Sequence, residues 1–113
     1  MKTDSIKLKR DKYRRARGGS SRLFKILCMK CGHQVALYQK DGPLGPLKRM
    51  YLDRILEPAE LVGLQQLPLK KVPMLVCPNC KEMLGVPFLY KKEERPSFRM
   101  FEAAVTKKLV RKE

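Results

Sequence analysis

The chain has 113 residues, enough for one small domain, and carries 26 Lys and Arg against 11 Asp and Glu, a formal net charge of +15. This basic excess is typical of proteins that bind a polyanion such as a nucleic acid. No stretch approaches the roughly 18 to 20 consecutive apolar residues of a membrane span, and the basic start of the sequence lacks the apolar core of a secretory signal. We therefore expect a cytoplasmic protein with no membrane partner.

Residues 1–20 are predominantly basic, with eight Lys and Arg, two Asp and few apolar side chains. Such a segment buries too little apolar surface to offset the entropy that it loses on ordering. We predict an arm that is disordered when the protein is free and that orders on RNA, followed by a Gly-Gly-Ser-Ser hinge. Tyr13 is a candidate for stacking on an unpaired base. The predicted phosphate contacts in this arm are Lys7, Lys9, Arg10, Lys12, Arg14, Arg15 and Arg17.

Residues 21–97 form the predicted domain, which begins with an apolar and β-branched stretch at residues 22–27. This stretch is predicted to be a strand that runs into a Cys-x-x-Cys pair, and residues 34–39 are predicted to be the matching strand after the pair. Arg22 is a predicted phosphate contact. Tyr38 is a second candidate for base stacking.

Residues 40–70 are predicted to be an insertion within the domain. Two Gly and two Pro make residues 40–46 a stiff loop whose backbone can closely approach another chain. The apolar spacing at residues 47–56 fits either a helix or a strand, and we favour a strand because the surrounding elements are strands. Pro58 suits the first turn of a short helix. The insertion adds the predicted phosphate contacts Lys40, Lys48, Arg49 and Arg54, and the stacking candidate Tyr51.

After the insertion, residues 69–76 are predicted to form the strand that enters the second cysteine pair, with an edge position or an irregularity indicated by Pro73. Residues 83–90 are the predicted strand that leaves the pair, and the charged residues 91–96 an exposed turn. Residues 98–113 are predicted to be a basic C-terminal extension, whose apolar spacing fits either a helix or a strand. Its predicted phosphate contacts are Lys107, Lys108, Arg111 and Lys112.

The two cysteine pairs, Cys28 with Cys31 and Cys77 with Cys80, supply four thiols of the kind that hold zinc in tetrahedral structural sites. Gly32, directly after the first pair, can adopt the positive φ that such a turn requires. We expect one structural Zn²⁺ whose binding stabilises the folded domain. A four-thiolate iron centre uses the same ligands and stays as an alternative.

Other cysteine chemistries fit the sequence poorly. A thioredoxin-like redox site uses one Cys-x-x-Cys pair beside a βαβ pattern, and covalent haem needs His directly after the second cysteine, where this chain has Gly32 or Lys81. Four thiolates leave no position for a catalytic water. The sequence shows neither a pair of catalytic carboxylates nor an evident partner for His33, its only histidine. We therefore expect a protein that is not an enzyme and has no small-molecule substrate.

The spacing of the pairs and their flanking strands resemble the zinc-ribbon class, which occurs in small ribosomal proteins and in transcription factors. The resemblance covers residues 22–39 and 72–90. It implies a small, mainly β fold of antiparallel strands with two zinc knuckles and room for one short helix, here extended by basic N- and C-terminal arms. With those arms, it favours a structural RNA-binding protein, a ribosomal component that contacts ribosomal RNA and neighbouring ribosomal proteins. The alternative is a zinc-ribbon transcription or DNA-binding factor.

Overall fold

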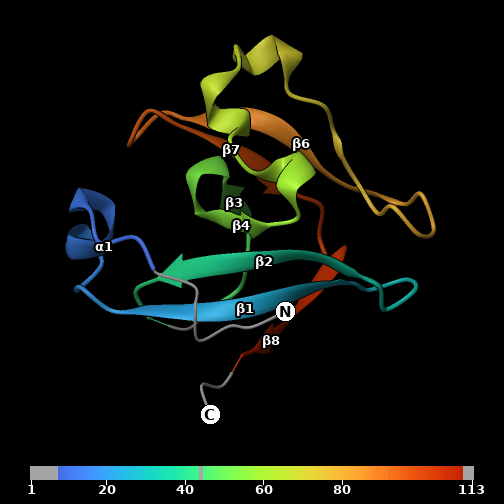
Figure 1. Cartoon of the computed structure of the whole chain (residues 1–113), viewed down its shortest axis with the longest axis horizontal. Helices are drawn as coiled ribbons and strands as arrows, with labels where there is room; N and C mark the ends of the chain where they lie inside the picture. Colours follow the sequence, from blue (N-terminus) through green and yellow to red (C-terminus); the bar gives the residue numbers. More distant parts are fainter. Residues whose placement is uncertain (1–7, 44, 111–113) are drawn as a thin grey trace.

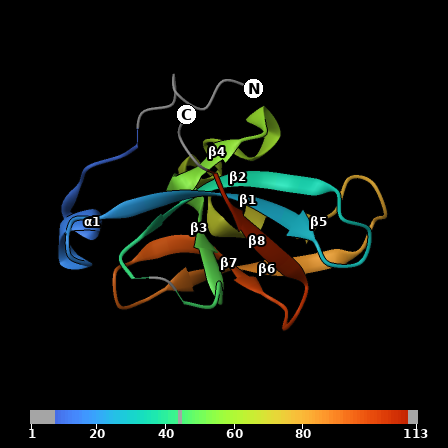
Figure 2. The ribbon, with the colours of Figure 1, turned by 90° about the horizontal axis from the view of Figure 1, so that it is seen from below.

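Antiparallel strands build two sheets in the part of the chain that the computed structural model describes, residues 8–43 and 45–110 (Figure 1). The first four-stranded sheet consists, in spatial order, of β4 (Ile55–Glu57), β2 (Gln34–Asp41), β1 (Ser21–Cys28) and β8 (Val105–Leu109). The second consists of β3 (Arg49–Tyr51), β7 (Arg95–Met100), β6 (Met83–Tyr90) and β5 (Leu75–Val76). The two sheets lie as layers in Figure 2. The prediction of a small, mainly β fold with antiparallel strands is confirmed.

β1 and β2 form the hairpin predicted on either side of the first cysteine pair. Alternation along β1 places Phe24, Ile26 and Cys28 on the buried face, while the residues between them are partly exposed. In the antiparallel register, Phe24 lies opposite Tyr38 and Ile26 lies opposite Ala36. One face of the hairpin therefore supplies the core with apolar side chains. The other edge of β1 pairs with β8, which comes from the far end of the described chain.

The second sheet is built on the hairpin of β6 and β7, which a turn at residues 91–94 connects. Leu84 of β6 and Phe98 of β7 are fully buried and share one hydrophobic core with the inward-facing residues of β1 and β2. The predicted strand at residues 83–90 has the same bounds as β6. Within residues 98–110 the strand alternative applies, because residues 98–100 complete β7 and residues 105–109 form β8, with a turn between them. The predicted domain boundary after residue 97 thus lies within β7.

Residues 47–56, predicted to be a strand, contain β3 and the start of β4, which belong to different sheets. β3 pairs with β7, whereas β4 pairs with β2. The chain therefore crosses the core between them, and the 3-10 helix η2 (Leu52–Arg54) makes the crossing with Leu52 and Arg54 fully buried. Pro58, predicted to begin a short helix, caps the single 3-10 turn η3 (Ala59–Leu61).

The predicted strand at residues 69–76 is mostly absent. The 3-10 turn η4 (Leu64–Gln66) precedes this range, a second turn, η5 (Leu69–Lys71), takes up its first three residues, and only Leu75–Val76 pairs with β6 as β5. Pro68 and Pro73 flank η5 and lack the N–H group that a ladder hydrogen bond needs. β5 is the edge strand of its sheet, which agrees with the position indicated by Pro73.

The described part of the predicted N-terminal arm contains the short helix α1 (Lys12–Ala16). Asp11 caps this helix by accepting hydrogen bonds from the backbone N–H groups of Tyr13 and Arg14. In Figures 1 and 2, α1 lies at the end of the molecule opposite the loops of the two cysteine pairs. No helix within residues 8–43 and 45–110 is long and apolar enough to cross a membrane. Disorder of the free arm stays a prediction, and residues 1–7 lie outside the described part.

Candidate metal centre and basic pocket

Two turns of the same geometry bring the four cysteines together. The N–H of Cys28 donates to the carbonyl five residues later, and the carbonyl of Cys28 accepts from the N–H four residues later. Cys77 makes the same two bonds in the second turn. The residue after each pair has a positive φ, 80° at Gly32 and 67° at Lys81. The expectation for Gly32 is confirmed, and Lys81 adopts the left-handed conformation without the freedom of glycine.

The four Sγ atoms form a cluster with the dimensions of a metal site. Cys28 Sγ lies 3.6 Å from Cys80 Sγ, and Cys31 Sγ lies 3.6 Å from Cys77 Sγ. All four lie within 4.8 Å of one another, and no disulfide joins them. Four sulfurs bound at about 2.3 Å to one tetrahedral ion lie about 3.8 Å apart. The predicted ligands therefore fit a zinc-ribbon-like site for one metal ion.

An ion at this site would link the two sheets. The first pair ends β1 in the first sheet, and the second pair lies between β5 and β6 in the second. Both loops lie at the same end of the molecule, on the right in Figures 1 and 2. With four protein ligands, a tetrahedral ion has no position left for water. The arrangement is that of a structural cross-link.

Two of the thiols have pKa values shifted in opposite directions. A hydrogen bond from the Asn79 side chain, assisted by the His33 backbone, lowers the pKa of Cys31 to about 6. A hydrogen bond from the Glu82 backbone opposes the shift of Cys80, but burial and the neighbouring sulfurs raise the pKa of Cys80 to about 12. Thiols bind a metal ion as thiolates, so binding of an ion at this cluster would release the protons that the four sulfurs hold.

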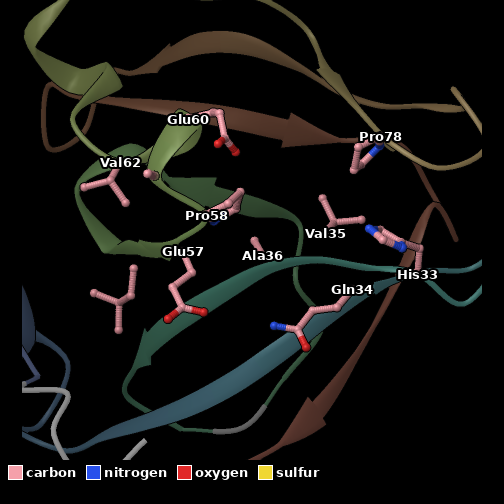
Figure 3. Close-up of a pocket in the computed structure, with 11 residues that line it drawn as sticks. His33, Gln34, Val35, Ala36, Glu57, Pro58, Glu60, Val62 and Pro78 are labelled. Carbon is pink, nitrogen blue, oxygen red and sulfur yellow. The ribbon is translucent and has the colours of Figure 1, made fainter. Parts of the chain in front are cut away.

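An open groove of about 790 Å³ lies beside the first cysteine turn (Figure 3). The start of β2, the turn between β4 and η3, and Pro78 line it. His33 and Pro78 line the same end of the groove in Figure 3, and its charged residues are Glu57 and Glu60. No Lys or Arg of the described residues lines it, so the groove does not suit a phosphate. The sulfur cluster is complete without His33, which is exposed.

Arg54, one of the predicted phosphate contacts, is completely buried in a network of ion pairs. Its guanidinium donates to Asp41 at 2.9 Å and to Asp11 at 3.0 Å. Asp53 lies 3.7 Å from Arg54 and accepts from Arg95 at 2.8 Å. This placement corrects the prediction for Arg54, because a fully buried side chain has no surface for an RNA phosphate.

The network continues to the end of α1. Glu93 accepts two hydrogen bonds from Arg17, at 2.7 and 2.8 Å, and one from Arg95 at 3.2 Å. The hydrogen bonds from Arg17 hold the pKa of Glu93 below its ordinary value. Asp53, Glu93 and Arg95 are structural residues that sequence reasoning missed. The scarcity of acids in so basic a chain is the one signal that could have pointed to these carboxylates as partners of buried arginines.

The tyrosines predicted to stack on bases already contact groups of this chain. Tyr38 is buried, and its hydroxyl accepts from the backbone N–H of Tyr51 at 2.8 Å. Burial raises the pKa of Tyr38. The guanidinium of Arg95 lies 4.0 Å from the ring centroid of Tyr13 and 3.7 Å from that of Tyr51. Tyr38 is therefore not available to stack on a base, which corrects the prediction. Arg95 covers one face of the Tyr13 ring and one face of the Tyr51 ring.

A pocket of about 310 Å³ collects predicted RNA contacts from three segments. Arg17 directly follows α1, Lys40 lies in β2, Arg49 begins β3, and Lys48 directly precedes it. Six of its ten lining residues are among the predicted contacts. A Cβ atom at Gly42 would lie 2.9 Å from Cβ of Arg17. The Gly-Pro loop, predicted to approach another chain closely, thus approaches the end of this chain's own α1.

The other predicted phosphate contacts are dispersed. Arg14 donates from Nε to Ser21 Oγ at 2.7 Å, and Lys107 lies over the ring of Phe24. Lys7, Arg111 and Lys112 lie outside the described residues. The remaining contacts are exposed: Lys9, Arg10, Lys12, Arg15, Arg22 and Lys108.

The metal centre and the basic pocket lie near opposite ends of β2, since Gln34 follows the first cysteine turn and Lys40 lines the pocket. Comparisons of the chain with models of protein families, with curated proteins and with solved structures gave no match. What the two sites do therefore has to be inferred from their residues and geometry.

Proposed function

We propose that this protein is a structural RNA-binding protein with one zinc ion, a cytoplasmic ribosomal component that contacts ribosomal RNA and neighbouring ribosomal proteins. The observation that carries the proposal is the division of charge within the molecule. Four of the 11 acidic residues and three of the 26 basic residues pair with one another in the internal network. The rest of the chain holds 23 Lys and Arg against seven acids. The surface that meets a partner is therefore more basic than the composition indicates.

This charge suits a nucleic acid, because Lys and Arg side chains release counterions from the phosphates that they neutralise. RNA is favoured over duplex DNA by the form of the basic surface. Many DNA-binding motifs place a recognition helix in the major groove, whereas α1 is only five residues long. The basic residues instead come from several short segments, which suits the irregular surface of folded RNA.

Zinc is the proposed metal because tetrahedral four-thiolate sites suit Zn²⁺. The ion would hold the two sheets together and would take no part in chemistry on a substrate, so the protein is proposed not to be an enzyme. Elemental analysis of the purified protein should find one zinc per chain. Iron with the absorption bands of an iron–thiolate centre would replace the zinc assignment.

The proposed function is tested by sedimentation of the native protein at moderate salt. We expect it to sediment with ribosomal particles and to be released by ribonuclease. Its affinity for RNA should fall with salt, with a slope of log K against log salt of about −4 to −5 if about six phosphates are neutralised. A protein found free or only with RNA polymerase would refute the ribosomal assignment and favour a transcription factor.

A further inference from the structure

We propose that the pocket formed by Lys40, Lys48, Arg49 and Tyr51 binds one phosphate group of an RNA backbone. This inference rests on the proposed RNA-binding function and identifies a place at which the RNA is held. The pocket has a volume of about 310 Å³. This size is at the lower end of the roughly 300 to 1,000 Å³ of small-ligand sites, which suits a phosphate with its adjoining sugar.

Three of the four positive charges in the pocket lining are not neutralised by carboxylates, and the fourth, Arg17, is paired with Glu93. Within the described residues, Lys40, Lys48 and Arg49 take part in no ion pair. Asp41, the one acid in the lining, is held by the buried guanidinium of Arg54 at 2.9 Å. The pocket therefore presents an excess of positive charge to an incoming group.

Tyr51 and Arg49 present hydrogen-bond donors to the pocket, while Lys40 Nζ donates to the Pro43 carbonyl at 3.1 Å. Tyr51 Oη accepts from Arg17 Nη2 at 2.8 Å and from Arg49 Nε at 2.9 Å, which occupies both of its lone pairs. The hydroxyl hydrogen of Tyr51 then has no acceptor among the described residues, and neither do the Nη groups of Arg49. A phosphate offers acceptor oxygens alone and forms strong charge-assisted bonds with such donors.

Arg49 is oriented before any ligand binds. Its guanidinium carbon lies 4.0 Å from the ring centroid of Tyr90 and 5.7 Å from that of Tyr51. It is therefore stacked on one aromatic ring while its Nε donates to the hydroxyl of the other. A guanidinium held in this way loses less conformational freedom on binding than a free side chain.

The pKa of Lys40 should report whether a phosphate occupies the pocket. Burial lowers the pKa of Lys40, and the positive charges of Lys107, Arg17 and Arg49 lower it further, against the opposing effect of Asp41. A phosphate in the pocket would compensate these charges. The pKa of Lys40 should therefore rise when the pocket is filled, and nuclear magnetic resonance of the lysine side chains can measure this change.

The test compares two full-length variants that lose the same charge. Lys40→Ala with Lys48→Ala removes two cations from the pocket, and Lys70→Ala with Lys71→Ala removes two exposed lysines at η5 outside it. Affinity for a fluorescein-labelled RNA hairpin is measured by anisotropy over a range of salt. The pocket variant should bind about tenfold more weakly than the control, with a salt slope smaller by about one. Equal zinc content and thermal midpoints show that both variants are folded.

The outcomes separate the inference from the function on which it rests. RNA binding by the wild type with equal losses in the two variants would overturn the phosphate site and leave the proposed function standing. Absence of RNA binding by the wild type at low salt would overturn both. A pKa of Lys40 that rises with RNA supports the site. A pKa that responds to inorganic phosphate but not to RNA would make the pocket a site for free phosphate and overturn the RNA assignment.

Discussion

Replacing Arg54 with methionine tests whether the internal ion-pair network stabilises the fold. Arg54 is completely buried and pairs with Asp41, whose side chain is 3% exposed, and with Asp11. Methionine keeps an unbranched side chain but leaves the carboxylate of Asp41 buried, with hydrogen bonds only from Ser21 and Gln39. Removing one partner of a buried ion pair costs about 3 to 5 kcal/mol. We expect Arg54→Met to lower the free energy of unfolding by this amount.

Urea unfolding followed by circular dichroism measures the loss. A small domain loses about 1 to 3 kcal/mol of stability per molar urea, so the midpoint should fall by about 1 M or more. Wild type and variant are compared at the same free zinc concentration, because a bound ion adds to the apparent stability. Arg22→Met, at an exposed arginine of β1, is the matched control. It should change the free energy of unfolding by less than about 0.5 kcal/mol.

A double variant identifies the cause. Adding Asp41→Asn to Arg54→Met removes the buried carboxylate charge that has lost its partner. The double variant should therefore recover part of the lost free energy of unfolding. A loss below about 1 kcal/mol in Arg54→Met would refute the view that the network stabilises the fold. A double variant no more stable than Arg54→Met would show instead that packing alone accounts for the loss.

Three further predictions follow from the metal centre and the network. Cys77→Ser should release the ion and unfold the domain, and a full metal content by elemental analysis would contradict the ligand assignment. Residues 32 and 81 both have positive φ, which glycine adopts without strain. Lys81→Gly should therefore raise the free energy of unfolding and Gly32→Ala should lower it, each by about 1 kcal/mol. Urea midpoints that shift in the same direction for both variants would argue against this. Hydrogen bonds from Arg17 lower the pKa of Glu93 in the folded protein. The carboxylate therefore stabilises the fold fully above its unfolded-state pKa of about 4.3. This stabilisation is lost as the pH falls through the lower folded-state pKa. Urea midpoints between about pH 7 and pH 3 should show this loss, and Glu93→Gln should remove its share of the pH dependence.

Local patterns were enough to predict the strands on both sides of the first cysteine pair and the strand that leaves the second pair. The strands before and after the first pair could be predicted because each is a short run rich in apolar and β-branched residues. The positive φ of Gly32 follows from the turn in which it lies. The four ligands could be identified because their spacing in the sequence reflects the geometry of tetrahedral coordination.

Features that depend on distant residues could not be predicted in this way. Arg54 has the same appearance in the sequence as an exposed arginine, and its partner Asp11 is 43 residues away. Residues 47–56 carry a strand signal, but nothing in them shows that β3 and β4 enter different sheets. Tyr38 is apolar enough for the core and polar enough for a surface, and only the packing of β2 decides between them.

The pairing of β1 with both β2 and β8 has a consequence for the order in which the newly made chain folds. β1 and β2 are adjacent in sequence and can pair early, but the other edge of β1 stays open until residues 105–109 have been synthesised. Folds with such distant pairings form slowly, and an open strand edge is a template for association with other chains. Arg22 and Lys25 on β1 place positive charge along this strand, which disfavours that association while the chain is incomplete.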